Sequence, residues 1–317
     1  MIWCLILQLI VNTHTKRSEN MQSDKTCTIV EQYLAYLVTI KNRSTNTILE
    51  YRLDLLQFFR YVATSRRYEH PNFQFADIEF IQSIQLGDMY AFLAYCQDTL
   101  NSSAGTRARK IISIRQFWKY LKTKAHLIDN NIAEELETPK QPKRMVRCLT
   151  LEESVRLLIE AASSSVRDNC IITIFLNCAL RLSELTSLNL DQVNTDILSV
   201  IGKGNKERKI YITPAVRKSL AQWMAVRRTL SVNTNALFIS RNGTRLTARS
   251  IQNVVKKHIV AAQINPEGLS THKLRHTAAT LMYKYGHVDI RSLQQILGHE
   301  SIATTEIYYG KQVIMVS

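Results

Sequence analysis

The length, composition and charge of the chain set the first limits on what it can be. It has 317 residues, of which 45% are hydrophobic and 21% are charged, so we exclude a disordered or fibrous protein and expect two folded domains. Its 41 lysine and arginine residues against 26 acidic residues give a formal charge of +15. This excess indicates a polyanionic partner, with nucleic acid first and an anionic membrane surface or another acidic partner as alternatives.

Residues 1–25 are predicted to be an N-terminal extension outside the fold. Residues 1–11 are apolar, but they lack the basic start and the small-residue cleavage site of a secretory signal and are too short to span a membrane. Met21 follows a polar stretch and is a candidate for the true start of translation. The six cysteines include no C-x-x-C pair, so we interpret them as reduced, intracellular thiols.

Residues 26–137 are predicted to form a helical domain. Apolar residues recur at helical spacing in four stretches, within residues 29–37, 51–62, 89–96 and 111–121. Residues 66–82 have no clear period and contain Pro71, so we expect an unusually long loop between the second and third helices. The next segment, residues 138–148, carries two prolines and four basic residues and is the predicted linker.

Residues 149–317 are predicted to form a second domain of mixed structure. Helical patterns cover residues 149–161, 166–180, 215–230, 248–262, 271–285 and 291–297. Two short β-rich runs, 197–201 and 209–212, flank a Gly-Lys-Gly-Asn turn and indicate a hairpin, and residues 236–240 are a candidate third strand. The predicted fold class is therefore mainly α with a small antiparallel β-sheet.

Two motifs after the linker carry charges that suit a phosphate ester. Arg181 and Glu184 have i, i+3 spacing, which places a guanidinium beside a carboxylate that can hold it in position. A surface ion pair at a helix end explains this spacing equally well. Lys203 lies in the predicted hairpin turn, where a flexible ammonium can reach a phosphate oxygen, although a solvated turn is the ordinary alternative.

The motif from His272 to His276 is the most specific. His272 and Arg275 have i, i+3 spacing, which pairs a proton-transfer group with a phosphate-binding group. His272 and His276 have the spacing of metal ligands, but the neighbouring Lys273 and Arg275 argue against a metal. We therefore interpret His276 as a packing or hydrogen-bonding residue.

His299 and Tyr308 complete an ordered set. A lone tyrosine at such a position is more often a half-buried anchor than a nucleophile. Here it follows two arginines, two imidazoles and a lysine within one predicted domain, which together can support phosphoryl transfer without a metal.

These motifs resemble the tyrosine recombinases, or phage-type integrases, and most closely their Xer-like bacterial branch. The resemblance extends from about Thr26 to Tyr309. It is strongest in residues 179–185, 201–208, 272–277 and 297–308, and residues 47–58 and 109–117 resemble the core-binding domain of the family. The two predicted domains would then be a helical core-binding domain and an α+β catalytic domain.

The resemblance implies a site-specific recombinase or integrase that cuts and rejoins duplex DNA without ATP, metal or another cofactor. Tyr308 would attack the scissile phosphate and form a 3′-phosphotyrosine, which conserves the energy needed for rejoining. His272 would take the proton from Tyr308, and Lys203 would be the general acid for the leaving 5′-oxygen. Arg181 and Arg275 would clamp the phosphate.

Two further roles follow from the same resemblance. His299 would hydrogen-bond a non-bridging phosphate oxygen, and Glu184 would support Arg181. The expected partners are double-stranded DNA and three further copies of the chain in a synaptic homotetramer on two DNA sites, with no membrane. The expected location is the bacterial cytoplasm, in association with the nucleoid.

Basic residues outside the catalytic set are candidates for DNA contacts, with solubility as the alternative role. They are Arg107, Arg109, Lys110 and Arg115 in the helical domain, and Lys143, Arg144 and Arg147 in the linker.

Two alternatives and two departures from the family pattern stay open. The alternatives are a type IB topoisomerase and a non-catalytic DNA-binding remnant of a mobile element. Family members commonly carry glycine just before the first catalytic arginine, where this chain has residues 178–180 as Cys-Ala-Leu, so we expect a differently packed turn. Ser317 lies nine residues after Tyr308, where relatives continue into a segment that packs on a neighbouring subunit, so subunit coupling stays open.

Overall fold

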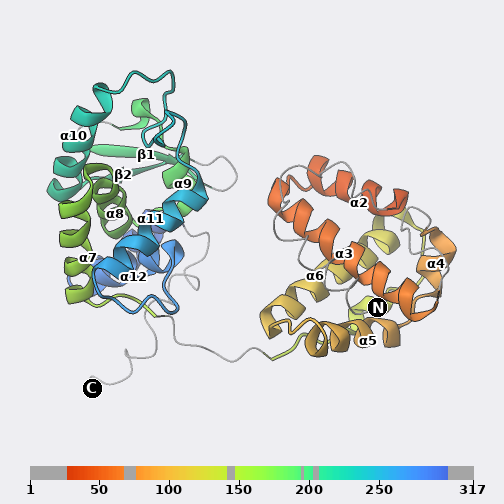
Figure 1. Ribbon diagram of the computed structural model, residues 1–317. Coiled ribbons are helices and arrows are strands. Elements are labelled where there is room, and N and C mark those ends of the chain that lie inside the picture. Colours follow the sequence, from red (N-terminus) through yellow and green to blue (C-terminus); the bar gives the residue numbers. More distant parts are fainter. Residues whose placement is uncertain (1–26, 68–75, 141–146, 194–195, 203–206, 299–317) are drawn as a thin grey trace, which may run out of the picture. The chain divides into compact units, whose positions relative to one another are not determined.

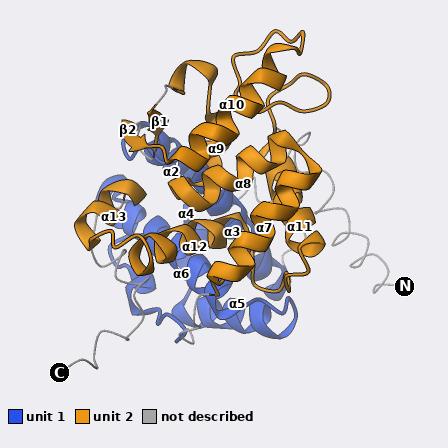
Figure 2. Ribbon diagram, turned by 90° about the vertical axis from the view of Figure 1, so that its left-hand side faces the viewer, with its two compact units in different colours: residues 1–143 blue, residues 144–317 orange. Residues whose placement is uncertain are grey.

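The computed structural model describes residues 27–67, 76–140, 147–193, 196–202 and 207–298 (Figure 1). The chain divides into two compact units, residues 1–143 and 144–317, which Figure 2 colours blue and orange. Within the described ranges, no helix is long and apolar enough to cross a bilayer. The predicted extension, residues 1–25, lies outside these ranges.

Unit 1 is helical. It contains α2 (Thr28–Thr39), α3 (Thr45–Ser65), α4 (Ile78–Ser83), α5 (Leu86–Asp98) and α6 (Ala104–Tyr120), followed by the short turns η2 (Leu121–Ala125) and η3 (Ile132–Glu135). Helix α4 lies in the stretch that we predicted as a loop, and the prediction is wrong there. Asp77 caps this helix and Ile81 buries its side chain, but six residues are too few to show a helical period.

The core of unit 1 is rich in aromatic side chains. Phe58, Phe92 and Trp118 are almost completely buried, and the rings of Phe92 and Trp118 meet Phe58 edge to face at centroid distances of 5.2 and 5.8 Å. These residues come from α3, α5 and α6, so they join the helices whose apolar spacing the sequence shows.

Unit 2 is built around one central helix, α8 (Val166–Cys178), which packs against α7 (Leu151–Ser164), α10 (Pro214–Arg228) and α12 (Thr271–Lys284) (Figure 1). A helix covered on several sides must be apolar around most of its circumference, and α8 is buried from Cys170 through Leu176. The remaining helices are α9 (Leu182–Ser187), α11 (Ala248–Ala261), α13 (Ile290–Leu297) and the short η4 (Leu190–Gln192).

The predicted hairpin is present in unit 2. Strands β1 (Ile197–Ile201) and β2 (Glu207–Tyr211) pair antiparallel with Ile197 opposite Tyr211, and Leu198, Val200 and Ile210 face the core. The candidate third strand is wrong: residues 236–240 form only isolated bridges, to Asn189 and Arg245. The predicted fold class, mainly α with a small antiparallel sheet, is confirmed.

Candidate active site

Arg181 and Glu184 lie at the start of α9. The chain leaves α8 through Ala179, which has a left-handed conformation with φ of 51°, and Arg181 is the extended N-cap residue of α9. The Glu184 carboxylate accepts the backbone N–H of Arg181 at 2.7 Å and its Nη1 at 2.8 Å. The predicted ion pair is present, although Arg181 precedes the helix instead of lying on its face.

Glu184 is the centre of a cluster of three arginines. Arg208, from β2, donates Nη1 and Nη2 to the two Glu184 oxygens at 2.6 and 2.8 Å, and Arg275 Nη1 lies 3.7 Å from Glu184 Oε2. The Glu184 side chain is 2% exposed. Burial raises the pKa of this carboxyl, but the hydrogen bonds from Arg208 and Arg181 outweigh that effect and lower its pKa to about 2. Glu184 is therefore ionised at neutral pH.

The same three arginines bind the C-terminal end of α13. Arg208 Nε donates to the Ile296 carbonyl at 3.0 Å, Arg275 Nη2 donates to the Leu297 carbonyl, and Arg181 Nη2 donates to the Gly298 carbonyl at 3.2 Å. The last carbonyls of a helix have no partner within the helix and carry a partial negative charge. Three consecutive carbonyls are thus satisfied by three guanidiniums from different elements. We name the three arginines, Glu184 and these carbonyls the arginine cluster.

His272 and His276 lie on successive turns of α12. Their Nε2 atoms are 3.0 Å apart and their rings meet at 87°, so one nitrogen donates a hydrogen bond and the other accepts it. His272 is exposed, whereas His276 is buried. Partial desolvation and the positive charges of Arg275, Lys273 and Arg181 lower the pKa of His272 below its ordinary value of 6.5. At neutral pH His272 is therefore mainly uncharged, as a general base must be.

The structure brings together four of the residues predicted from the sequence: Arg181, Glu184, His272 and Arg275. Lys203, His299 and Tyr308 lie outside the described residues.

Sequence reasoning missed Arg208, which binds Glu184 more extensively than any other side chain in the described cluster. The signal was available. Arg208 is the last residue of the Gly-Lys-Gly-Asn-Lys-Glu-Arg motif, and it lies on β2, the second strand of the hairpin. What the sequence could not show is that β2 lies beside the start of α9.

The candidate DNA-contact residues of unit 1 lie in different surroundings. Lys110 is buried, and its Nζ binds Asp54 at 3.0 Å and Gln57, so we leave it out of any proposed contact surface. Arg109 is half-buried and pairs with Asp54 and Glu50. Arg107 donates to the Ser102 carbonyl, and the Nε of Arg115 is buried with no hydrogen-bond partner among the described residues.

The linker candidates are only partly described. Arg147 donates to the Glu267 carbonyl at 2.7 Å and its side chain is 32% exposed, while Lys143 and Arg144 lie outside the described residues.

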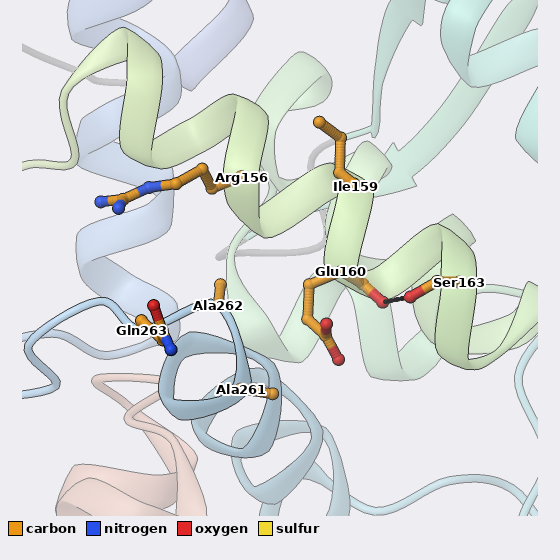
Figure 3. Close-up of a pocket in the computed structure, with 7 residues that line it drawn as sticks. All are labelled: Arg156, Ile159, Glu160, Ser163, Ala261, Ala262 and Gln263. Atoms are coloured by element: carbon orange, nitrogen blue, oxygen red, sulfur yellow. Dashed lines mark hydrogen bonds between the residues drawn. The ribbon is translucent and has the colours of Figure 1, made fainter.

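An open depression between α7 and α11 is shown in Figure 3. It is lined by Arg156, Ile159, Glu160, Ser163 and residues 261–263, and Ser163 Oγ donates to the Glu160 carbonyl at 2.9 Å. Arg181, Glu184, His272 and Arg275, the described residues predicted to carry chemistry, do not line it. The candidate active site is instead the arginine cluster together with His272.

Comparisons with known proteins identify the family of this chain. Residues 147–313 match the phage integrase family, and residues 30–125 match the phage integrase N-terminal SAM-like domain. A tyrosine recombinase XerC from Caldanaerobacter subterraneus subsp. tengcongensis is 44% identical over 297 residues, which cover 91% of this chain and 84% of that relative. The chain therefore belongs to the phage integrase family.

Solved structures show the same fold at lower identity. A XerH site-specific recombinase bound to difH substrate has a TM-score of 0.67 at 22% identity, covering 90% of this chain and 81% of that one. A lambda integrase tetramer bound to a Holliday junction has a TM-score of 0.67 at 16% identity, covering 91% and 79%. The predicted membership of the Xer-like tyrosine recombinases is confirmed, and with it the enzyme class, a site-specific recombinase.

Proposed function

We propose that this chain cuts and rejoins duplex DNA at specific sites through a covalent bond between Tyr308 and a 3′-phosphate. The observation that carries the proposal is the arginine cluster beside an uncharged histidine. Arg181 and Arg275 share Glu184, and their charges act on His272. This arrangement suits a phosphodiester, because guanidiniums stabilise the charge that develops on phosphorus-bound oxygens while a neutral imidazole takes a proton.

Each proposed role accounts for a bond, a proton or a charge in the reaction. The Tyr308 oxygen forms a bond to phosphorus and gives its proton to His272, and the bond to the 5′-oxygen breaks as Lys203 protonates that oxygen. Arg181 and Arg275 bind the non-bridging oxygens, with a further hydrogen bond from His299. Glu184 orients Arg181 through the bond at 2.8 Å. Rejoining is the same sequence in reverse, so no external energy source is required.

The exposures of the two arginines suggest how they divide this work. Arg181 is 33% exposed, so its guanidinium can meet an incoming phosphate. Arg275 is almost fully buried and donates to the Ala179 carbonyl at 2.7 Å and to the Leu297 carbonyl. These two bonds fix the plane of its guanidinium, so Arg275 would act as the preorganised member of the pair.

The proposed partners are duplex DNA and further copies of the chain. The known structures with this fold include a recombinase bound to difH substrate and an integrase tetramer bound to a Holliday junction, which supports a synaptic homotetramer on two DNA sites. In unit 1 and the linker, the proposed contacts are Arg107, Arg109, Arg115, Lys143, Arg144 and Arg147. We further propose that the protein acts in the bacterial cytoplasm, on DNA of the nucleoid.

A nicked suicide substrate tests the proposal. If the nick lets the short 5′-hydroxyl strand diffuse away, each cleavage leaves a stable covalent adduct that is visible as a slower band on a denaturing gel. We expect an adduct with the wild-type chain and none with Tyr308→Phe. Because the target sequence is unknown, the substrates are drawn from the DNA flanking the gene and from a random-sequence library. An adduct that persists in Tyr308→Phe, or no adduct with any substrate, would overturn the proposal.

A further inference from the structure

Arg208 lies where three segments of unit 2 meet: strand β2, the start of α9 and the end of α13. Its Nη1 and Nη2 donate to the two oxygens of Glu184 at 2.6 and 2.8 Å, and its Nε donates to the Ile296 carbonyl at 3.0 Å. All three nitrogens are therefore engaged by oxygens of the protein, and the side chain is only 14% exposed. A guanidinium held in this way has one fixed orientation.

The position of Arg208 affects both arginines of the proposed phosphate clamp. Glu184 accepts hydrogen bonds from Arg208 and Arg181 and lies 3.7 Å from Arg275 Nη1. A shift of the Glu184 carboxylate would therefore disturb both clamp arginines. The end of α13 is shared in the same way, because Arg208, Arg275 and Arg181 bind three consecutive carbonyls of residues 296–298. Arg208 is thus linked to each clamp arginine through two independent bridges.

We infer that Arg208 is a positioning residue for the phosphate clamp: it fixes Glu184 and the end of α13, and these orient Arg181 and Arg275. Arg208 would act on the phosphate indirectly, through Glu184 and the end of α13. This inference rests on the proposed clamp function of Arg181 and Arg275. It predicts that Arg208 controls the rate of cleavage and has little effect on the binding of DNA.

Lysine cannot replace arginine in this role. An ammonium is a point charge, whereas the planar guanidinium spans both carboxylate oxygens and still presents Nε to the Ile296 carbonyl. Arg208→Lys therefore preserves the charge of the cluster and removes only its geometry. A displacement of about 1 Å at a reacting group can cost about 100-fold in rate.

Gly298 offers a second, milder way to disturb Arg208. It ends α13 in the left-handed conformation with φ of 60°, and a Cβ there would lie 3.4 Å from Arg208 Cδ and 3.5 Å from its Nη1. These are ordinary van der Waals distances, so Gly298→Ala would act by straining the left-handed end of α13, where Arg208 binds the Ile296 carbonyl. We expect a smaller effect of the same kind.

The test measures single-turnover adduct formation at saturating suicide substrate, together with the affinity for uncleaved DNA. For Arg208→Lys we expect a rate about 100-fold below that of the wild type and an affinity within about threefold. The matched control is Arg227→Lys: this arginine is also buried and also binds carbonyls, those of Thr234 and Ala236, but it is not part of the arginine cluster. Its rate should stay within about threefold of wild type in samples that melting shows to be folded.

A double-mutant cycle separates positioning from a general loss of structure. If Arg208 acts through Arg181 and Arg275, the variant Arg208→Lys/Arg181→Lys should lose clearly less than the product of the two single losses, because only the positioning of Arg275 is still there to be lost. A rate equal to the product of the two single losses, or a normal rate for Arg208→Lys, would overturn the inference. Should Arg208→Lys not fold, Gly298→Ala replaces it in the same cycle, and we expect its rate of adduct formation to fall about tenfold. A wild-type rate for Gly298→Ala would then overturn the inference. A wild-type chain that forms no adduct would instead refute the proposed function.

Discussion

Each unit of this chain has a buried carboxylate among basic side chains, Asp54 in unit 1 and Glu184 in unit 2, but the two groups differ in charge balance. In unit 1, Asp54 is 1% exposed and binds Arg109, Lys110 and the hydroxyl of Ser113. Arg109 also pairs with Glu50 at 3.0 Å. Two cations therefore face two carboxylates, and this group, the Asp54 network, is electrically balanced.

Among the described residues, the arginine cluster of unit 2 sets three guanidiniums against one carboxylate. Glu184 is just as buried as Asp54, but it faces three guanidiniums, those of Arg181, Arg208 and Arg275. Buried charge without compensation is costly, and the helix end of α13 supplies only partial negative charge. The Asp54 network therefore leaves no excess charge to neutralise, whereas the excess of positive charge among the described residues of the arginine cluster favours an anion, which is the phosphate of our proposal.

The largest expected effect comes from a matched pair of arginines. Arg181 is 33% exposed beside buried Glu184, and Arg109 is 37% exposed beside buried Asp54. We expect Arg181→Lys to lower the rate of adduct formation at saturating DNA by about 1000-fold, because a preorganised donor to the reacting phosphate is lost. Arg109→Lys should change this rate by less than about threefold, even if DNA affinity falls. Equal rates for the two variants would remove the functional distinction between the groups.

Removing the buried carboxylate from each group should have unequal effects on stability. Glu184→Gln removes the carboxylate charge that the three guanidiniums share, so we expect it to lower the free energy of unfolding of unit 2 by about 4 kcal/mol. Asp54→Asn should cost unit 1 about 2 kcal/mol, since Glu50 still faces Arg109 and Gln57 still accepts from Lys110. Hydrogen exchange of the peptides covering α9 and α6 measures the two losses separately.

Adding sulfate to the two variants tests whether the arginine cluster carries an excess of positive charge. An anion that binds the arginine cluster should restore part of the protection lost in Glu184→Gln and none of that lost in Asp54→Asn. Equal recovery in both units would show a general salt effect and would contradict the comparison.

The lowered pKa of Glu184 gives a pH dependence with a definite sign. Its folded-state pKa of about 2 lies below the ordinary 4.5, so the folded state favours the ionised form. The resulting stability, about 3 kcal/mol, is complete above the ordinary pKa and is lost as pH falls toward 2. Glutamine does not titrate, so the difference in unfolding free energy between wild type and Glu184→Gln should shrink between about pH 6 and pH 3. A constant difference would mean that the carboxylate is not held by its arginines.

The sequence predicted most helices and strands correctly, but it did not predict which of them pack against one another. Helical spacing located α8 and α12, and two β-rich runs around a Gly-Lys-Gly-Asn turn located the hairpin, because these patterns reflect local structure. Helix α4 was missed because its six residues are stabilised by a cap and one buried isoleucine, without a repeated pattern.

The same limit applies to the site. Arg181, Glu184, His272 and Arg275 were found because each pair lies three residues apart, so local geometry brings them together. Arg208 reaches Glu184 from 24 residues away, and only the packing of β2 beside α9 joins them. Lys110 illustrates the opposite case. The sequence suggested a surface charge, but the side chain binds the buried Asp54 of α3.

The smallest expected effect concerns the turn that presents Arg181. Ala179 has φ of 51° and its carbonyl accepts Arg275 Nη1 at 2.7 Å. An L-residue in this conformation is strained by about 1–2 kcal/mol, which glycine would relieve, while loss of a buried methyl and the greater freedom of the unfolded chain cost a similar amount. We therefore expect Ala179→Gly to change the unfolding free energy by less than about 0.5 kcal/mol. The matched control is Ala278→Gly, at a residue equally buried in the same apolar cluster but within α12, where the substitution should cost about 2 kcal/mol. Urea unfolding of both variants measures the contrast, and equal losses would show that the left-handed turn before Arg181 stores no strain.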